Sequence, residues 1–292
     1  MSMRQEAMSD GGEDDVNSEL SAGGGMDMWS SCAEYFPSVP DHLVVMVHGI
    51  LGSTTDWQFG ASQFVKSFSD KIMIHCSECN MYKLTLDGVD VMGERLTKEV
   101  ASVINSRSEL MKISFVAHSV GGLIVRYAIG RLYRPPGEKL QESSDNLNKD
   151  DTKGTIYGLE AMNFITVATP HLGSRGNGQV PFLFGFTSIE NIVSRVVHWI
   201  LGRTGRHLFL TDDDDGEPPL LLKMVNDSTG LYFWSALQSF KRRVVYANAG
   251  CDQIVGWRTS SIRRKSELPK VRYSLNDEHN NSSFVFVKAT LF

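Results

Sequence analysis

The feature that most constrains the fold of this chain is a short turn around Ser119, which joins an apolar segment to a helical one. Residues 112–118 have the apolar character of a strand, and residues 122–131 repeat apolar side chains at helical spacing. A serine in such a turn lies on a strained backbone, and only small residues two positions to either side let the chain pass so tightly. Ala117 and Gly121 fill those positions. The segment therefore predicts a strand, a tight elbow and a helix, with Ser119 at the tip.

The start of the predicted helix gives Ser119 a chemical setting. The first backbone N–H groups of a helix have no partner within it, and the helix dipole is positive at that end. Such groups stabilise the negative charge that forms on the oxygen of an attacked carbonyl. We expect the N–H of Val120 to be the first of these donors. A serine between small residues is also compatible with an ordinary strand-to-helix turn, so other segments must decide.

A glycine-rich turn follows an earlier apolar run. Residues 43–47 are continuously apolar, as in a strand buried on both faces, and residues 48–52 read His-Gly-Ile-Leu-Gly. Glycines let a loop bring its backbone close to a bound molecule, and the N–H of Ile50 or Leu51 is the expected second oxyanion donor. We expect His48 to pack beneath this loop as a hydrogen-bonded core residue and not to act as a base.

Two later runs have the same organisation. Residues 163–168 form a buried-strand pattern that stops at Thr169-Pro170-His171-Leu172-Gly173, and residues 243–249 form a strand that leads to Asp252. Open parallel sheets carry their sites at the carboxyl ends of the strands. We therefore expect these turns, Ser119 and Asp252 to converge at one edge of a sheet.

Together, these motifs resemble those of the eukaryotic serine esterase family, a lipase-like branch of the α/β-hydrolase superfamily. The resemblance covers roughly residues 41–265. It implies an α/β-hydrolase fold with an eight-stranded, mostly parallel sheet flanked by helices. It also implies that Ser119 is the nucleophile, that Asp252 is the acid, and that the substrates are carboxyl esters or lipids.

The base is the part of the pattern that this sequence does not match. In these enzymes a histidine follows the acid, and His279 is the only one of the eight histidines beyond Asp252. It precedes residues 284–287, which could form a final strand, whereas the family's histidine follows that strand. Two hypotheses result: His279 acts from an unusual position, or the chain ends at Phe292 before the segment that delivers the histidine. The order of the segments favours the second, with an incomplete C-terminal part and weak or absent activity.

Composition agrees with one globular hydrolase domain, assigned to residues 41–292, because 41% of the chain is hydrophobic and 22% is charged. Residues 1–40 are predicted to be a disordered, acidic and glycine-rich head. This head has neither a basic start nor a continuous apolar core, so we expect no secretory signal and a cytoplasmic location. The polar stretch 134–155 is predicted to be a surface insertion. A net charge of -5 gives no reason to expect nucleic acid as a partner.

An apolar segment lies between the predicted sixth strand and the acid. Residues 182–201 are rich in aromatic and β-branched side chains, and we predict a helical, lid-like insertion over 182–210. An apolar lid face would cover a pocket or contact a lipid surface, so residues 182–206 are the expected peripheral membrane contact. An ordinary core helix fits equally well. Glu190 and Arg195 interrupt the run, which argues against a transmembrane helix.

No cofactor or metal is predicted. Cys76 and Cys79 form a Cys-x-x-Cys pair without two further ligands nearby, and reduced structural thiols are the simpler interpretation. The sequence thus predicts a serine hydrolase that cleaves carboxyl esters, with acyl lipids favoured, through an acyl-enzyme on Ser119. The alternative is a catalytically weak or inactive hydrolase-fold module that binds a lipid or a protein partner.

Overall fold

A computed structural model describes residues 26–27, 39–68, 71–137, 154–174, 201–248, 252, 255–267 and 286–290. Over these residues the centre of the molecule is a seven-stranded sheet with the order β1-β3-β2-β4-β7-β8-β9. Its strands are β1 (Met26–Asp27), β2 (His42–Val47), β3 (Ile72–Cys76), β4 (Lys112–His118), β7 (Glu160–Val167), β8 (Arg242–Asn248) and β9 (Phe286–Thr290). The five central strands are parallel, and the two edge strands β1 and β9 run antiparallel to their neighbours.

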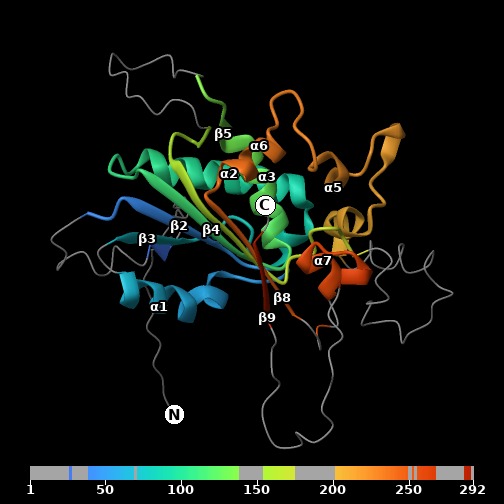
Figure 1. Cartoon of the computed structure of the whole chain (residues 1–292), viewed down its shortest axis with the longest axis horizontal. Helices are drawn as coiled ribbons and strands as arrows, with labels where there is room; N and C mark the ends of the chain where they lie inside the picture. Colours follow the sequence, from blue (N-terminus) through green and yellow to red (C-terminus); the bar gives the residue numbers. More distant parts are fainter. Residues whose placement is uncertain are drawn as a thin grey trace, which may run out of the picture.

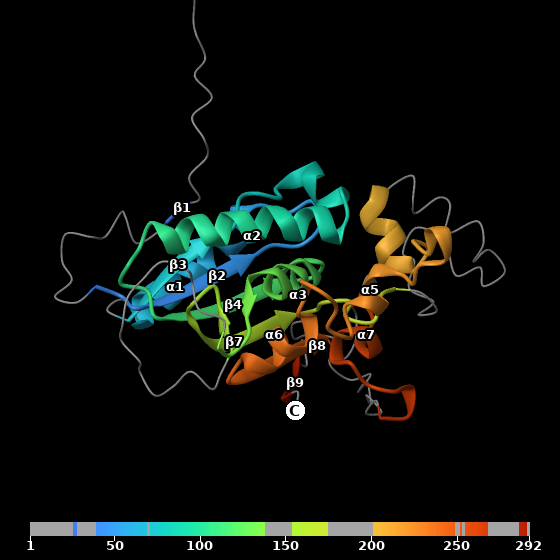
Figure 2. The same cartoon turned by 90° about the horizontal axis from the view of Figure 1, so that it is seen from above.

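Helices lie on both sides of this sheet (Figure 1), with α1 on one side and α2, α3 and α6 on the other. The α-helices are α1 (Gln58–Phe68), α2 (Val89–Asn105), α3 (Gly121–Leu132), α5 (Leu220–Lys223), α6 (Phe233–Ser239) and α7 (Trp257–Ser261). Residues 201–209 are also helical. The 3-10 turns are η2 (Thr54–Trp57), η3 (Tyr82–Leu86), η5 (Asp214–Gly216) and η6 (Lys265–Glu267). Figure 2 shows helix 201–209, α5 and α7 gathered beyond one end of the sheet.

Strands β2 and β3 are buried on both faces because their side chains alternate between two cores. In β2, Leu43 and Val45 pack into the core that contains α2 and α3. Val44 and Met46 pack into the second core, which contains Ala61 of α1. This two-sided burial explains why the strands have continuous apolar sequences instead of alternating ones.

Three phenylalanines join the strands around the middle of the larger core. Phe240, just before β8, has its ring centroid 6.1 Å from that of Phe115 in β4 and 5.8 Å from that of Phe164 in β7. All three are at most 1% exposed. The Phe115–Phe240 pair is close to edge-to-face at an interplanar angle of 70°, and the Phe164–Phe240 pair is tilted at 60°.

The strand, elbow and helix predicted around Ser119 are confirmed as β4 and α3, with β4 at the predicted bounds. The other predicted strands are present with shifts of a few residues at their ends. The described residues form seven strands of the sheet, for which the family resemblance implied eight in all, and the final strand predicted over 284–287 is described as β9 from residue 286 to 290.

The predicted head and insertion lie largely outside the described residues. Within the head, residues Met26–Asp27 form strand β1, which pairs with β3 so that Asp27 lies opposite His75. This part of the head, predicted to be disordered, is therefore a strand. At the base of the insertion 134–155, β5 (Tyr133–Arg134) pairs with β6 (Thr155–Ile156) in a two-stranded ribbon. Among the helices that the structure describes, none is long and apolar enough to cross a membrane.

Candidate active site

Four turns meet at one edge of the sheet because the strands before them are parallel and in register. Val47 of β2 is paired with Ala117 of β4, and His118 of β4 is paired with Val167 of β7. Val167 is in turn paired with Tyr246 of β8. The chain leaves these strands at nearly the same level, which brings residues 48–52, 119–122, 168–174 and 252 to a common edge. This convergence matches the expectation for an open parallel sheet.

Ser119 occupies a strained turn between β4 and α3. Its φ is 53°, in the left-handed region that non-glycine residues rarely adopt. Its backbone N–H donates to Val167 O at 2.9 Å, which holds the turn against the neighbouring strand. A β-carbon at Gly121 would lie 2.5 Å from His48 O, so the residue after the turn must lack a side chain. Ser119 itself is half-buried.

The loop 48–52 packs directly against Ser119. A β-carbon at Gly49 would lie 2.9 Å from Ser119 Cβ, so glycine is what allows this close approach. The N–H of Leu51 donates to Thr85 Oγ1 at 2.8 Å. Within the part of the chain that the structure describes, the N–H groups of Ile50 and Val120 donate to no acceptor. Ile50, and not Leu51, therefore supplies a free N–H beside Ser119.

His48 lies beneath this loop, as the sequence predicted. It is 1% exposed, and its Nδ1–H donates to Gly49 O at 3.0 Å. His118 precedes the serine and packs over the same loop, with Nδ1 3.1 Å from the position of a Gly49 β-carbon. Burial lowers the pKa of His118, while the charges of Asp56 and Asp252 raise it. Asp56 and Asp252 are thus both close enough to the His118 imidazole to favour its protonated form.

Asp252 lies just beyond β8, and both of its carboxylate oxygens accept hydrogen bonds. Asn248 Nδ2 donates to Asp252 Oδ2 at 2.9 Å, and the Val255 N–H donates to Asp252 Oδ1 at 2.8 Å. The carboxylate is therefore oriented from the end of the strand and from the following turn. The sequence analysis singled out Asp252 but not Asn248, although a polar side chain at a strand end, four residues before a candidate acid, was an available signal.

His279 lies outside the described residues, but the strand after it bears on its role. Strand β9 is antiparallel to β8, with Phe286 paired with Asn248 and Thr290 paired with Val244. The chain therefore enters β9 at the edge that carries Ser119 and Asp252. Because β9 is antiparallel, the segment before it joins the sheet at this edge, so the position of His279 before the strand does not exclude a role at the site.

The loop 168–174 is fixed by buried polar contacts. His171 is 5% exposed, and its Nε2 is 2.9 Å from Thr166 Oγ1. Burial and then the charge of Arg126 place the pKa of His171 well below its ordinary value. From α3, Arg126 donates to His171 O and to Met224 O, each at 3.2 Å, and burial lowers the pKa of its guanidinium to about 10.

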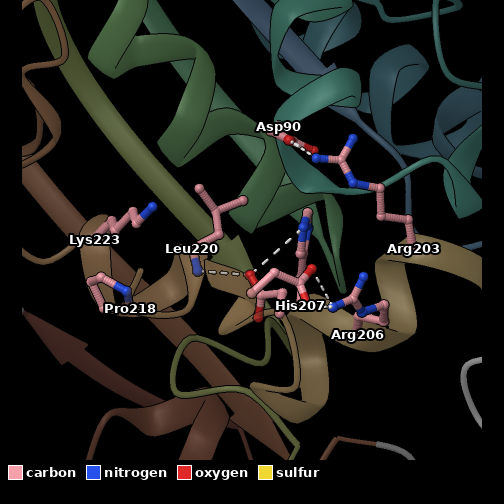
Figure 3. A pocket seen from close by; sticks show the side chains of 9 residues that line it. Asp90, Arg203, Arg206, His207, Pro218, Leu220 and Lys223 are labelled. Atoms are coloured by element: carbon pink, nitrogen blue, oxygen red, sulfur yellow. Dashed lines mark hydrogen bonds and ion pairs between the residues drawn. The ribbon is translucent and has the colours of Figure 1, made fainter. Parts of the chain in front are cut away.

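A polar cavity of about 180 Å³ lies between helix 201–209, α5 and the start of α2 (Figure 3). Its arginines are ion-paired, Arg203 with Asp90 and Arg206 with Asp214. These are two of the three arginines of the predicted membrane contact 182–206; the third, Arg195, lies outside the described part. Among the described residues, no group of three His, Cys, Asp or Glu side chains is placed to hold a metal ion.

The sheet topology and the elbow serine, with the turns of neighbouring strands around it, define this molecule as an α/β-hydrolase. The chain belongs to the family described as Putative serine esterase (DUF676), whose sequence profile matches residues 37–262. It is 29% identical over 245 residues to Putative lipase ROG1 of Saccharomyces cerevisiae, covering 81% of this chain and 31% of that protein. It is 28% identical over 255 residues to Putative lipase C4A8.10 of Schizosaccharomyces pombe, covering 84% and 29%.

The chain thus spans about a third of the length of these curated relatives. Among solved structures, it is similar to the lipase BlEst2 of Bacillus licheniformis in mature form, with a TM-score of 0.36 and 18% identity. That match covers 64% of this chain and 63% of the other. The fold assignment rests on the topology described above and on the family.

Proposed function

We propose that this chain hydrolyses carboxylic esters of acyl lipids through an acyl-enzyme on Ser119. The observation that supports this most directly is the geometry of the elbow. Ser119 has a left-handed backbone between β4 and α3, and the N–H groups of Ile50 and Val120, on either side of it, have no acceptor among the described residues. Two such donors at a serine nucleophile suit the oxyanion of a tetrahedral intermediate.

In the proposed reaction, Ser119 Oγ attacks the carbonyl carbon of the ester while its proton passes to His279. The carbonyl oxygen becomes an oxyanion that accepts hydrogen bonds from Ile50 and Val120. Collapse of this intermediate breaks the ester bond, and the leaving alcohol takes the proton from His279. A water molecule then attacks the acyl-enzyme by the same steps, releasing the fatty acid and restoring Ser119. Asp252 orients the histidine, as the acid does in other triads.

The direction of β9 supports His279 as the base. His279 lies seven positions before Phe286, the residue that is paired with Asn248 at the site edge. Seven residues span at most about 25 Å when extended, so the chain is long enough for the ring to come between Asp252 and Ser119. Asn248 is proposed to keep Asp252 in the orientation that this contact requires.

Lipids are favoured as substrates because apolar side chains flank the site on two loops. Leu51 is 55% exposed on the loop after β2, and Leu172 is 44% exposed on the loop after β7. Exposed apolar groups at the mouth of a site suit an acyl chain. The names of the yeast relatives, both lipases, agree with this choice. Peripheral contact with a lipid surface and a cytoplasmic location stay predictions.

The test is covalent labelling of the purified chain by a fluorophosphonate probe. We expect labelling of the wild type and its loss in Ser119→Ala and in His279→Ala, because the probe requires a nucleophilic serine. Ser62→Ala is the matched control, since this exposed helical hydroxyl only donates to Phe59 O. Robust labelling of Ser119→Ala would contradict the assignment of the nucleophile.

A binding module without catalysis is the competing function. It would give a folded wild-type chain that does not react with the probe at all. Labelling that survives in His279→Ala but not in Ser119→Ala would leave the nucleophile in place and remove His279 as the base.

A further inference from the structure

The loop that carries the proposed oxyanion donor Ile50 is held by a side chain from a different element. The Leu51 N–H donates to Thr85 Oγ1 at 2.8 Å, and the Thr85 hydroxyl donates to Tyr82 O at 2.6 Å. The Tyr82 N–H in turn donates to Gly52 O at 2.9 Å. The 3-10 turn η3 is thus joined to the loop 48–52 by two hydrogen bonds. The Thr85 hydroxyl has a fixed direction because it donates one hydrogen bond and accepts another.

These hydrogen bonds matter because the loop 48–52 has a strained backbone. Leu51 has a φ of 55°, a left-handed conformation that costs a leucine of order 1 kcal/mol or more. Such a conformation persists only when its surroundings impose it. The Leu51 N–H has its acceptor in Thr85, which is 0% exposed and has little freedom to move. Loss of this acceptor would let the loop relax, and the adjacent Ile50 N–H would move with it.

A second buried threonine fastens η3 to helix 201–209. The Thr204 hydroxyl donates to Thr85 O at 2.7 Å and accepts from the Gly88 N–H at 3.0 Å. Thr204 is also 0% exposed. The helix packs directly on the turn, since a β-carbon at Gly202 would lie 2.8 Å from Leu86 O. One continuous set of hydrogen bonds therefore runs from helix 201–209 through η3 to the loop beside Ser119.

Helix 201–209 is also bonded to the start of α2, and these contacts fix its position relative to α2. His207 Nδ1 accepts from the Val89 N–H at 3.0 Å, and Arg203 pairs with Asp90 (Figure 3). These contacts occupy the first turn of α2, where backbone N–H groups lack partners within the helix. Helix 201–209 is thus held independently of the loop 48–52, and Thr204 can transmit its position to Thr85.

We propose that Thr85 is a positioning residue that sets the loop 48–52 for transition-state stabilisation, and that Thr204 couples this setting to helix 201–209. The inference rests on the proposed function, because it concerns the oxyanion donor of that reaction. It adds two residues that touch neither substrate nor nucleophile and that lie 34 and 153 positions from Leu51 in the sequence.

The first test replaces the hydroxyl by a methyl group. We expect Thr85→Val to lower kcat on a p-nitrophenyl ester and the rate of fluorophosphonate labelling by about tenfold, with KM nearly unchanged. Removal of a whole oxyanion donor costs about 10²- to 10³-fold, and a misplaced donor should cost less. Because the interaction acts on charge that forms in the transition state, the loss should fall on kcat. Thr85→Ser, which keeps the hydroxyl, should recover activity to within about threefold of wild type.

Thr97→Val is the matched control. It removes a threonine hydroxyl that donates to Gly93 O within α2, away from the loop, and it should leave kcat unchanged. Thermal unfolding of each variant separates a positioning effect from a loss of folded protein. If valine is poorly accommodated at position 85, Thr85→Ala gives the same test with a smaller side chain.

The coupling to the helix is tested by a double-mutant cycle. We expect Thr204→Val to lower kcat by about threefold, and the double variant with Thr85→Val to be no worse than Thr85→Val alone, because both changes break one pathway. Effects that multiply in the double variant would contradict the link through Thr204.

The outcomes separate this inference from the function on which it rests. A wild-type chain that does not label would overturn both. A folded Thr85→Val variant that labels at the wild-type rate, or a Thr85→Ser variant that is as impaired as the valine, would overturn the positioning role while leaving Ser119 as the nucleophile.

Discussion

Single glycines decide how closely the start of α3 approaches its surroundings. A β-carbon at Gly122 would lie 2.2 Å from Thr169 Oγ1 and 2.9 Å from Thr166 Cγ2. Real β-carbons do not approach other atoms so closely, and both neighbours are buried in β7 and the loop after it. The helix therefore has to begin with residues that lack side chains if its N–H groups are to face the site edge.

Gly122→Ala should therefore destabilise the protein, by about 1–3 kcal/mol, as overpacking of a filled core does. In Gly60→Ala a β-carbon would lie 3.5 Å from Trp57 Cε3, an ordinary contact in the exposed helix α1. That control should stabilise the protein by roughly 0.5–1 kcal/mol through helix propensity. Urea denaturation measures both, and stabilisation by the alanine at position 122 would contradict the packing argument.

At the scale of elements, the order of the strands depends on a side chain that belongs to none of them. Phe240 follows α6 and precedes β8, and its ring packs against Phe115 of β4 and Phe164 of β7. The segment between α6 and β8 is thereby attached to the two strands on which the site turns depend. The Arg243 side chain donates to Phe240 O, which fixes the backbone at the same point.

Phe240→Ala should lower the free energy of unfolding by about 3–5 kcal/mol, the range for large buried aromatic residues. Trp234→Ala in α6 is the control, because Trp234 is 49% exposed and its loss should cost well below that range. The comparison is made by denaturant titration with matched m-values. Equal losses in the two variants would mean that the contacts of Phe240 do not hold the strands together.

At the scale of the whole molecule, four histidines in different elements share one electrostatic property. Burial lowers the pKa of His42, His118, His171 and His207. Each is therefore neutral in the folded protein at a pH where the unfolded chain, with ordinary pKa values near 6.5, already binds protons. The unfolded state then takes up more protons, so stability falls as the pH falls.

The free energy of unfolding should accordingly be nearly constant above about pH 7.5 and should decrease as the pH drops below about 6.5. Glu99 adds a second loss at lower pH. Burial alone would raise its pKa, but the neighbouring His75 and hydrogen bonds from Ser77 and the Glu78 backbone lower it from 4.5 to about 2. Denaturation at a series of pH values measures the slope, and His171→Asn should reduce it between pH 6.5 and 5. Stability that rises over that interval would contradict the prediction.

Local sequence patterns predicted the parts of the site that form within one strand and its turn. The apolar run into Ser119, the glycines of the loop 48–52 and the carboxylate after β8 are short segments whose structure depends on their own residues. Because parallel strands end at one edge, these segments could also be placed together without knowledge of distances. The predicted site residues stay a proposal, since His279 lies outside the described part.

The remaining features depend on docking between distant segments, which periodicity does not encode. Nothing near Thr85 indicates that its hydroxyl accepts from Leu51, 34 positions away. The direction of β9 was also not predictable, since an apolar run gives the same pattern in a parallel and an antiparallel strand. That direction changes the role available to His279, because it decides at which edge the preceding loop joins the sheet.

Arg126 holds the long connection between β7 and β8 at two points, one near each end of it. One guanidinium on α3 donates to His171 O, shortly after β7 ends, and to Met224 O, on the way to β8. A single side chain therefore ties the start of this connection, at His171, to a point near its end, at Met224. A different connection grafted between these two carbonyls would keep both attachments to α3, but it would have to retain Thr204 for the loop 48–52 to stay as it is.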